Sequence, residues 1–79
     1  MEGKKSSKRR REEFTEVSLK VGQLIRKRKI EQGFTQTELA RKVSITQPDL
    51  SKIEEGKKNI TLFTLGRICK VLGIKKIEL

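Results

Sequence analysis

Four side chains between residues 46 and 56 could contact the edges of nucleic-acid bases. Leu50 and Ile53 are three positions apart, so both lie on one side of a helix and are expected to face inward. The outward side of that helix carries Gln47, Pro48, Ser51 and Lys52. Amide, hydroxyl and ammonium groups on a short, rigid helix can hydrogen-bond to base edges in the major groove of DNA. The spacing is typical of a binding surface rather than of a catalytic centre.

A short helix is predicted immediately before this one, starting at Thr35. Thr35 and Glu38 have the Thr-x-x-Glu spacing of a capping box, in which each side chain accepts a hydrogen bond from the backbone N–H of the other residue. The inward residues of this helix are Leu39, Ala40 and Val43. Ala40 is small, which allows the two short helices to approach each other closely.

Residue types also mark the turn and the start of the second short helix. Ser44 and Ile45 fall between the two helical patterns. Thr46 is suited to cap the second helix, with Asp49 at the capping-box position three residues later, and Gly56 is suited to end it. Residues 35–56 are therefore predicted to form two short helices joined by a tight turn.

Longer helices are predicted on both sides of this segment. Apolar residues at helical spacing predict a helix over residues 14–32 that ends at Gly33. Its inward residues are Phe14, Val17, Val21, Leu24 and Ile25. A second helix is predicted from Thr61 to Gly73, with inward residues Leu62, Leu65, Ile68, Cys69 and Leu72. Residues 74–79 are β-prone and are expected to form either a short strand or a last helical turn.

The charge of the chain favours a polyanionic partner. The 79 residues include 20 Lys and Arg against 10 Asp and Glu, a formal net charge of +10. Nucleic acid is the first candidate partner and an acidic protein or membrane surface the second, while solubility alone is the simpler explanation. Half of the excess, a net +5, lies in residues 1–11, and we expect residues 1–13 to form a flexible basic arm. The arm either contacts phosphates and the minor groove or is a solvated tail.

The composition argues against catalysis, metal binding and membrane insertion. The sequence has no histidine and one cysteine, so it offers neither a zinc site nor an internal disulfide. We expect Cys69 to be a small core residue rather than a reactive thiol. No apolar stretch approaches the roughly 20 residues of a membrane span, and the N-terminus does not resemble a secretory signal. A cytoplasmic, nucleoid-associated protein that is not an enzyme and needs no cofactor is expected.

Residues 21–74 resemble the Cro/C1-type (XRE) helix-turn-helix family of phage repressors and bacterial regulators. The resemblance rests on several short motifs that occur in the family's order and at its spacing. These motifs are Gly33-Phe34-Thr35-Gln36, Glu38-Leu39-Ala40, Leu50-Ser51-Lys52-Ile53-Glu54-Glu55-Gly56-Lys57, Leu65 and Leu72-Gly73-Ile74. It implies an all-α, lambda-repressor-like bundle of four or five helices over residues 14–73, with residues 74–79 as a dimer contact or a short C-terminal strand.

The same resemblance implies roles for individual side chains. Family members mostly bind double-stranded DNA as homodimers. Carried onto this sequence, the base-reading residues are Gln47, Pro48, Ser51 and Lys52. The phosphate-binding residues are Gln36, Lys57, Lys58 and Asn59. A phosphate at the N-terminus of the helix that begins near Gln36 is physically reasonable, because unpaired N–H groups and the helix dipole favour an anion there.

The sequence departs from the family pattern at a few positions. Ser44 stands where the family often has glycine, so either the turn accepts strain or it needs no positive φ. Arg28 replaces a residue that is usually apolar, and Pro48 is unusual among base-reading residues. Lys29 replaces a common arginine that pairs with the glutamate at Glu54. We therefore expect a Lys29–Glu54 pair, weaker than the forked contact that arginine makes.

Two functional hypotheses share this DNA-binding face. The first is a sequence-specific transcriptional regulator, in particular a repressor that binds a pseudo-palindromic operator as a homodimer. The second is an antitoxin that represses its own operon and also binds a toxin protein, since the start of the last helix and the C-terminal tail are similar to that subgroup. A helical scaffold domain that does not bind DNA is a third alternative. Affinity for duplex DNA that falls steeply with salt would exclude the scaffold.

Overall fold

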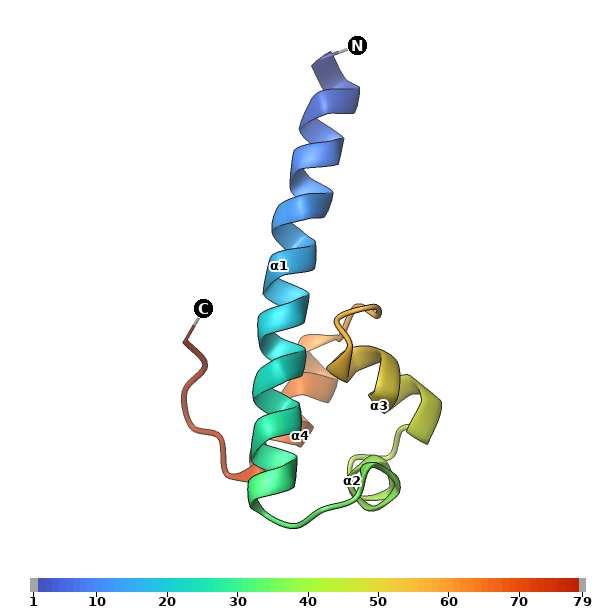
Figure 1. The fold of residues 1–79 in the computed structure, drawn as a ribbon, viewed down its shortest axis with the longest axis vertical. Coiled ribbons are helices and arrows are strands. Elements are labelled where there is room, and N and C mark those ends of the chain that lie inside the picture. The colour runs from blue at the N-terminus through green and yellow to red at the C-terminus, as the bar shows by residue number, and fades with distance from the viewer. Residues whose placement is uncertain (1, 79) are drawn as a thin grey trace.

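The computed structural model describes the backbone of residues 2–78 and the side chains of residues 16–78. The described residues contain helices and no strand, which confirms the all-α prediction. No helix in this part of the chain has the length and apolar character needed to cross a membrane. Figure 1 shows the four helices, which are α1 (Glu2–Glu31), α2 (Gln36–Lys42), α3 (Gln47–Glu54) and α4 (Leu62–Leu72).

Helix α1 begins at Glu2, so the start predicted near residue 14 was wrong. Residues 2–13 are rich in Lys, Arg and Glu, whose unbranched side chains favour a helix, and the segment contains no proline. The backbone therefore has no break at residue 13, where we expected a flexible arm to end. In Figure 1 this part of α1 projects away from the other three helices.

The hydrophobic core lies where the C-terminal half of α1 meets α2, α3 and α4. Each fully buried Leu or Ile contributes about 1.5–3 kcal/mol of transfer free energy. The Gln32 side chain donates a hydrogen bond to the Leu72 carbonyl and so ties the end of α1 to the end of α4. The buried apolar residues are Val21, Ile25, Leu39, Ala40, Val43, Leu50, Ile53, Ile68 and Leu72, all of which the sequence pattern had placed inward.

A few side chains lie differently from the prediction. Leu62 is 86% exposed and Val17 is 41% exposed, although both were expected to face inward. Leu62 is the first residue of α4, one turn beyond the part of the helix that the core covers. Cys69 is half-buried, and burial raises the pKa of its thiol, which favours the protonated form. The side chain of Phe14 lies outside the described residues.

The C-terminal segment is neither a strand nor a helical turn over residues 74–78. Gly73 ends α4 in the left-handed conformation, with φ of 69°. The chain then reverses along α1, and the side chains of Ile74 and Ile77 are half-buried. A β-ladder needs a neighbouring strand, and none exists among the described residues, so the β propensity of this segment is not realised.

Helix α1 approaches the C-terminal end of α3 closely enough to require a glycine. A Cβ placed on Gly22 would lie 2.6 Å from the carbonyl oxygen of Glu54 and would also collide with that of Ile53. Both obstacles are backbone atoms, which cannot move aside as a flexible side chain can. No motif or spacing in the sequence had indicated this role for Gly22.

A buried ion pair lies beside this close approach and confirms the expected contact. The Lys29 Nζ is 2.7 Å from Glu54 Oε1, and the two side chains are only 10% and 4% exposed. The second carboxylate oxygen, Glu54 Oε2, is buried and has no hydrogen-bond partner among the described residues. A single ammonium therefore satisfies only half of the carboxylate, as expected when lysine replaces arginine.

We expect Lys29→Arg to stabilise the protein by about 1 kcal/mol, because a guanidinium can donate to both carboxylate oxygens. Lys29→Met should instead destabilise it by about 3–5 kcal/mol, because the carboxylate is then buried without a partner. Urea unfolding followed by circular dichroism measures both changes. Equal stability of the wild type and the Met variant would show that the ion pair contributes nothing.

Candidate nucleic-acid interface

The start of α2 is fixed by the capping box that the sequence predicted. The Glu38 backbone N–H donates to Thr35 Oγ1 at 3.1 Å, and the Thr35 N–H donates to Glu38 Oε1 at 3.0 Å. The hydrogen bond from the Thr35 backbone is the main cause that lowers the pKa of the Glu38 carboxyl. These bonds use N–H groups that the first turn of a helix leaves unpaired. Gln36 is the first residue of the helix, and its side chain is half-buried.

The turn between α2 and α3 contains a residue with a positive φ. Ser44 has φ of 59°, in the left-handed region. Of the two alternatives that the sequence left open, the turn therefore accepts backbone strain at Ser44. This conformation costs a residue with a Cβ roughly 1–2 kcal/mol. Arg67, on α4, donates a hydrogen bond to Ser44 Oγ at 3.0 Å. The side chain that causes the strain therefore also makes a contact that glycine could not make.

At the start of α3, Thr46 caps the helix as predicted. The side chain of Asp49, however, contacts a different partner from the one predicted. Thr46 Oγ1 accepts a hydrogen bond from the Asp49 N–H at 3.2 Å. The Asp49 carboxylate contacts Lys58, with Nζ 2.8 Å from Oδ1. The hydrogen bond from Lys58 is the largest cause that holds the pKa of the Asp49 carboxyl below its ordinary value. Asp49 therefore links the first turn of α3 to the loop that follows the helix.

The predicted base-reading side chains gather on the outward face of α3. Gln47, Pro48 and Lys52 are exposed, and Ser51 is half-buried. Gln47 Nε2 donates a hydrogen bond to Gln36 Oε1, so the structure brings together the first residues of α2 and α3. Ser51 Oγ lies 3.4 Å from Glu55 Oε1, which makes a long hydrogen bond. Gln47 is therefore oriented by a neighbour on the other helix.

Both lysines that were predicted to bind phosphates are paired with acidic side chains, which lie in α3 or directly after it. Lys57 Nζ is 3.0 Å from Glu55 Oε2, and Lys58 contacts Asp49 as described above. The hydrogen bond from Lys57 is the largest cause that lowers the pKa of the Glu55 carboxyl. Asn59 is exposed. A phosphate that binds either lysine must compete with a carboxylate already in place.

Sequence reasoning missed three contacts of this site: Gln36 with Gln47, Ser44 with Arg67, and Asp49 with Lys58. The available signal was weak. Each pair joins residues from separate elements, and local spacing does not show which side chains of two elements meet. Only Asp49 and Lys58 carried a hint, because opposite charges flank the same short helix.

Comparisons with known proteins agree with this geometry. A helix-turn-helix family model matches residues 24–79. The protein of Sinorhizobium fredii named as the HTH-type transcriptional regulator y4dJ is 34% identical over 59 residues, which cover 75% of this chain and 77% of that protein. A protein of Methanothermobacter thermautotrophicus named as an HTH-type transcriptional regulator is 38% identical over 55 residues, covering 70% of this chain and 80% of that protein. The chain belongs to the Cro/C1-type (XRE) helix-turn-helix family of DNA-binding transcriptional regulators.

The Ser44–Arg67 contact predicts an energetic coupling between the turn and α4. In a double-mutant cycle of Ser44→Gly and Arg67→Ala, we expect a coupling of about 0.5–1 kcal/mol, because only the wild type has the hydrogen bond. Ser44→Gly should stabilise the Arg67→Ala protein, where it relieves the positive φ without losing a bond. Chemical denaturation measures all four proteins. Additive effects of the two substitutions would rule out the contact in solution.

Proposed function

We propose that this protein is a sequence-specific repressor that binds a pseudo-palindromic operator in double-stranded DNA as a homodimer. The observation that carries the proposal is the exposed polar face at the start of α3, where Gln47 is held by Gln36. A helix-turn-helix protein inserts its second helix into the major groove, and the N-terminal residues of that helix contact the bases. The protein would act in the cytoplasm, on the DNA of the nucleoid.

Each residue of the α3 face has a chemically defined partner. The Gln47 amide offers an acceptor oxygen and a donor NH2 group, which match the N6 and N7 of adenine respectively. Lys52 can donate to O6 or N7 of guanine, and Ser51 can accept or donate at several bases. Pro48 offers no donor but can pack against the methyl group of thymine. A good two-bond contact discriminates against the wrong base by about 1–3 kcal/mol.

The residues around this face would hold the sugar-phosphate backbone. Gln36 would bind a phosphate at the start of α2, and Lys57, Lys58 and Asn59 would bind phosphates beside the end of α3. The basic residues 1–13 would add attraction that is independent of base sequence. Two protomers would bind half-sites about one helical turn, roughly 34 Å, apart.

We expect Gln47→Ala and Lys57→Ala to affect DNA binding in different ways. Gln47→Ala should relax the preference at one base pair per half-site, because it removes a base contact. Lys57→Ala should weaken binding to all sequences alike and reduce the salt slope by about 1, because it removes a phosphate contact. Selection of bound duplexes from a random pool, followed by gel shifts over a salt series, measures both effects.

Lys75→Ala is the matched control for this experiment, since Lys75 is an exposed lysine on the C-terminal segment, away from α2 and α3. It should change affinity less than Lys57→Ala does. The base-reading assignment is wrong if the Gln47→Ala protein selects the same sequences as the wild type.

The Asp49–Lys58 pair predicts a substitution that strengthens binding. Asp49→Asn should raise affinity for any duplex a few fold, because it frees Lys58 and removes a negative charge from the DNA-facing side. The lowered pKa keeps the wild-type carboxylate charged down to pH values below its ordinary 3.8, so pH between 5 and 8 should not mimic the substitution. Fluorescence anisotropy with a labelled duplex measures the change.

Glu31→Gln provides the charge-matched control. Glu31 lies at the end of α1, 3.7 Å from Arg28, and its substitution changes the net charge by the same amount. If both variants gain equal affinity, net charge explains the effect and Lys58 does not contribute through Asp49.

A further inference from the structure

A polar cleft lies between the C-terminal half of α1 and the segment that follows α4. The cleft has a volume of about 290 Å³, and residues 74–76 form one of its walls. In Figure 1 this segment runs beside α1 on the side away from α3. Basic side chains predominate in the lining, which makes the cleft a candidate site for an anion. The polar lining residues are Lys27, Arg28, Glu31, Lys75 and Lys76.

The residues that α1 contributes to the cleft face away from the recognition helix. They begin at Leu24 and end at Glu31, with spacings of three, four and seven positions, so they share one face of α1. Gly22 and Lys29 are on the face that meets α3. Leu24 follows Gly22 by two positions and Glu31 follows Lys29 by two, which corresponds to about 200° around the helix. The cleft therefore opens on the opposite side of α1 from α3.

Arg28 stands where the family usually has an apolar residue, and its side chain is half-buried in the wall of the cleft. It forms an ion pair with Glu31, but Nη1 and Oε1 are 3.7 Å apart, which is too long for a hydrogen bond. Within residues 16–78, the Arg28 side chain makes no hydrogen bond. A guanidinium has five N–H donors in a planar fork. Arg28 therefore brings to the cleft a set of donors that the fold itself does not use.

The lysines of the cleft also differ from those beside α3. Lys57 and Lys58 are each held by a carboxylate, at 3.0 Å and 2.8 Å. Lys27 and Lys75 are exposed, and neither has an ion pair within residues 16–78. Lys76 has an ion pair in which the two side chains are 80% and 81% exposed, and such a pair contributes little stability. An anion that enters the cleft would therefore displace only weak contacts.

Helix termini account for only part of the positive charge in the cleft. The ends of α1 and α4 lie next to each other, where Gln32 donates to the Leu72 carbonyl, and basic residues favour such ends. Each helix C-terminus is equivalent to a charge of about −0.5, so the two ends offset roughly one positive charge. The lining has four basic side chains and one acidic side chain, a net charge of +3. About two positive charges therefore remain available to a ligand.

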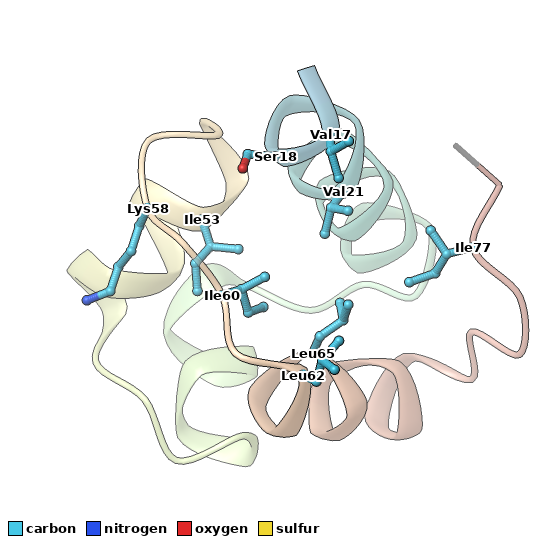
Figure 2. A pocket seen from close by; sticks show the side chains of 9 residues that line it. All are labelled: Val17, Ser18, Val21, Ile53, Lys58, Ile60, Leu62, Leu65 and Ile77. Carbon is cyan, nitrogen blue, oxygen red and sulfur yellow. The ribbon is translucent and has the colours of Figure 1, made fainter. Parts of the chain in front are cut away.

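Another hollow beside the C-terminal segment does not suit an anion. Figure 2 shows this apolar groove, which side chains of α1, α3 and α4 line together with Ile77. Among the described residues around it, Lys58 is the one with a positive charge, and its ammonium contacts Asp49. In Figure 2 that ammonium points away from the groove. Of the two hollows, only the polar cleft directs positive charge toward a ligand.

We propose that the polar cleft binds a small ligand with two or more phosphate groups, which Arg28 holds by its fork and Lys27 and Lys75 hold by their charge. A guanidinium binds two phosphate oxygens at once, and a phosphate carries more charge than a carboxylate. The cleft is close in size to the smallest sites for small molecules, about 300 Å³. The polyphosphate is either free or attached to a nucleoside, whose ring would contact the half-buried Leu24 and Ile74. This site goes beyond the proposed function, because it lies away from the base-reading face.

Two neighbouring side chains of the cleft should have opposite effects on this ligand. Glu31 repels a phosphate and competes with it for the Arg28 guanidinium. Glu31→Gln should therefore tighten binding. Arg28→Leu should raise the dissociation constant by about tenfold or more, as expected when a hydrogen bond between charged groups is lost. Because the family usually has an apolar residue at position 28, Arg28→Leu should keep the fold.

Isothermal titration calorimetry of the full chain tests the site. The ligands are inorganic tripolyphosphate and adenosine triphosphate, each without divalent cations and at about 0.15 M salt. The wild type should bind one equivalent per chain, and Lys75→Gln should weaken binding several fold. Lys70→Gln and Glu16→Gln are the charge-matched controls, since both residues are exposed and lie outside the lining. Each control should change the dissociation constant by less than about twofold.

Each outcome supports or overturns the site. Tighter binding of adenosine triphosphate than of tripolyphosphate supports a nucleotide ligand, and equal binding supports a free polyphosphate. A wild type that binds neither overturns the proposal, as do equal losses in Arg28→Leu and Lys70→Gln, which would indicate attraction by net charge alone. Circular dichroism checks the fold of Arg28→Leu, and Lys75→Gln decides the matter if that protein unfolds. A greater loss of duplex affinity in Arg28→Leu than in Lys70→Gln would make DNA the occupant and also overturn the proposal.

Discussion

The packing of α1 against the C-terminal end of α3 sets the position of the recognition helix. Gly22 allows the two backbones to approach, and the buried Lys29–Glu54 pair joins the same two helices seven residues further along α1. Seven residues span about two turns of α1, roughly 10 Å, and both contacts meet the last residue of α3, at the backbone of Glu54 for Gly22 and at its carboxylate for Lys29. A backbone contact and a buried ion pair at the same residue hold the C-terminal end of α3 against α1.

The electrostatics of the face combine attraction with local neutralisation. The chain is strongly basic overall, yet Lys57 and Lys58 are held by Glu55 and Asp49 in the free protein. In the proposed complex, phosphates would replace these carboxylates, so the gain in binding free energy would be smaller than the number of lysines suggests. Such competition would weaken attachment to arbitrary DNA and leave more of the affinity to the proposed base contacts. Under the proposed function, the acidic residues beside the face would therefore favour discrimination between sequences.

Helix α4 is linked to the helix-turn-helix through Arg67. Arg67 contacts Ser44 in the turn before α3 and also covers one face of Phe63 on the outer surface of α4. The Phe63 ring and the turn before α3 therefore share one side chain, Arg67.

The sequence by itself determined where α2, α3 and α4 begin, because Thr35, Thr46 and Thr61 act as caps through bonds to residues three positions away. It also determined the nine buried apolar residues, since helical spacing fixes which side chains share a face. It misplaced Leu62 and the start of α1, because periodicity shows which face is apolar but not how far the core extends. Tertiary structure alone decided that Gln36 meets Gln47, that Arg67 meets Ser44 and that Gly22 admits α3, because these contacts depend on how separate helices are placed in space.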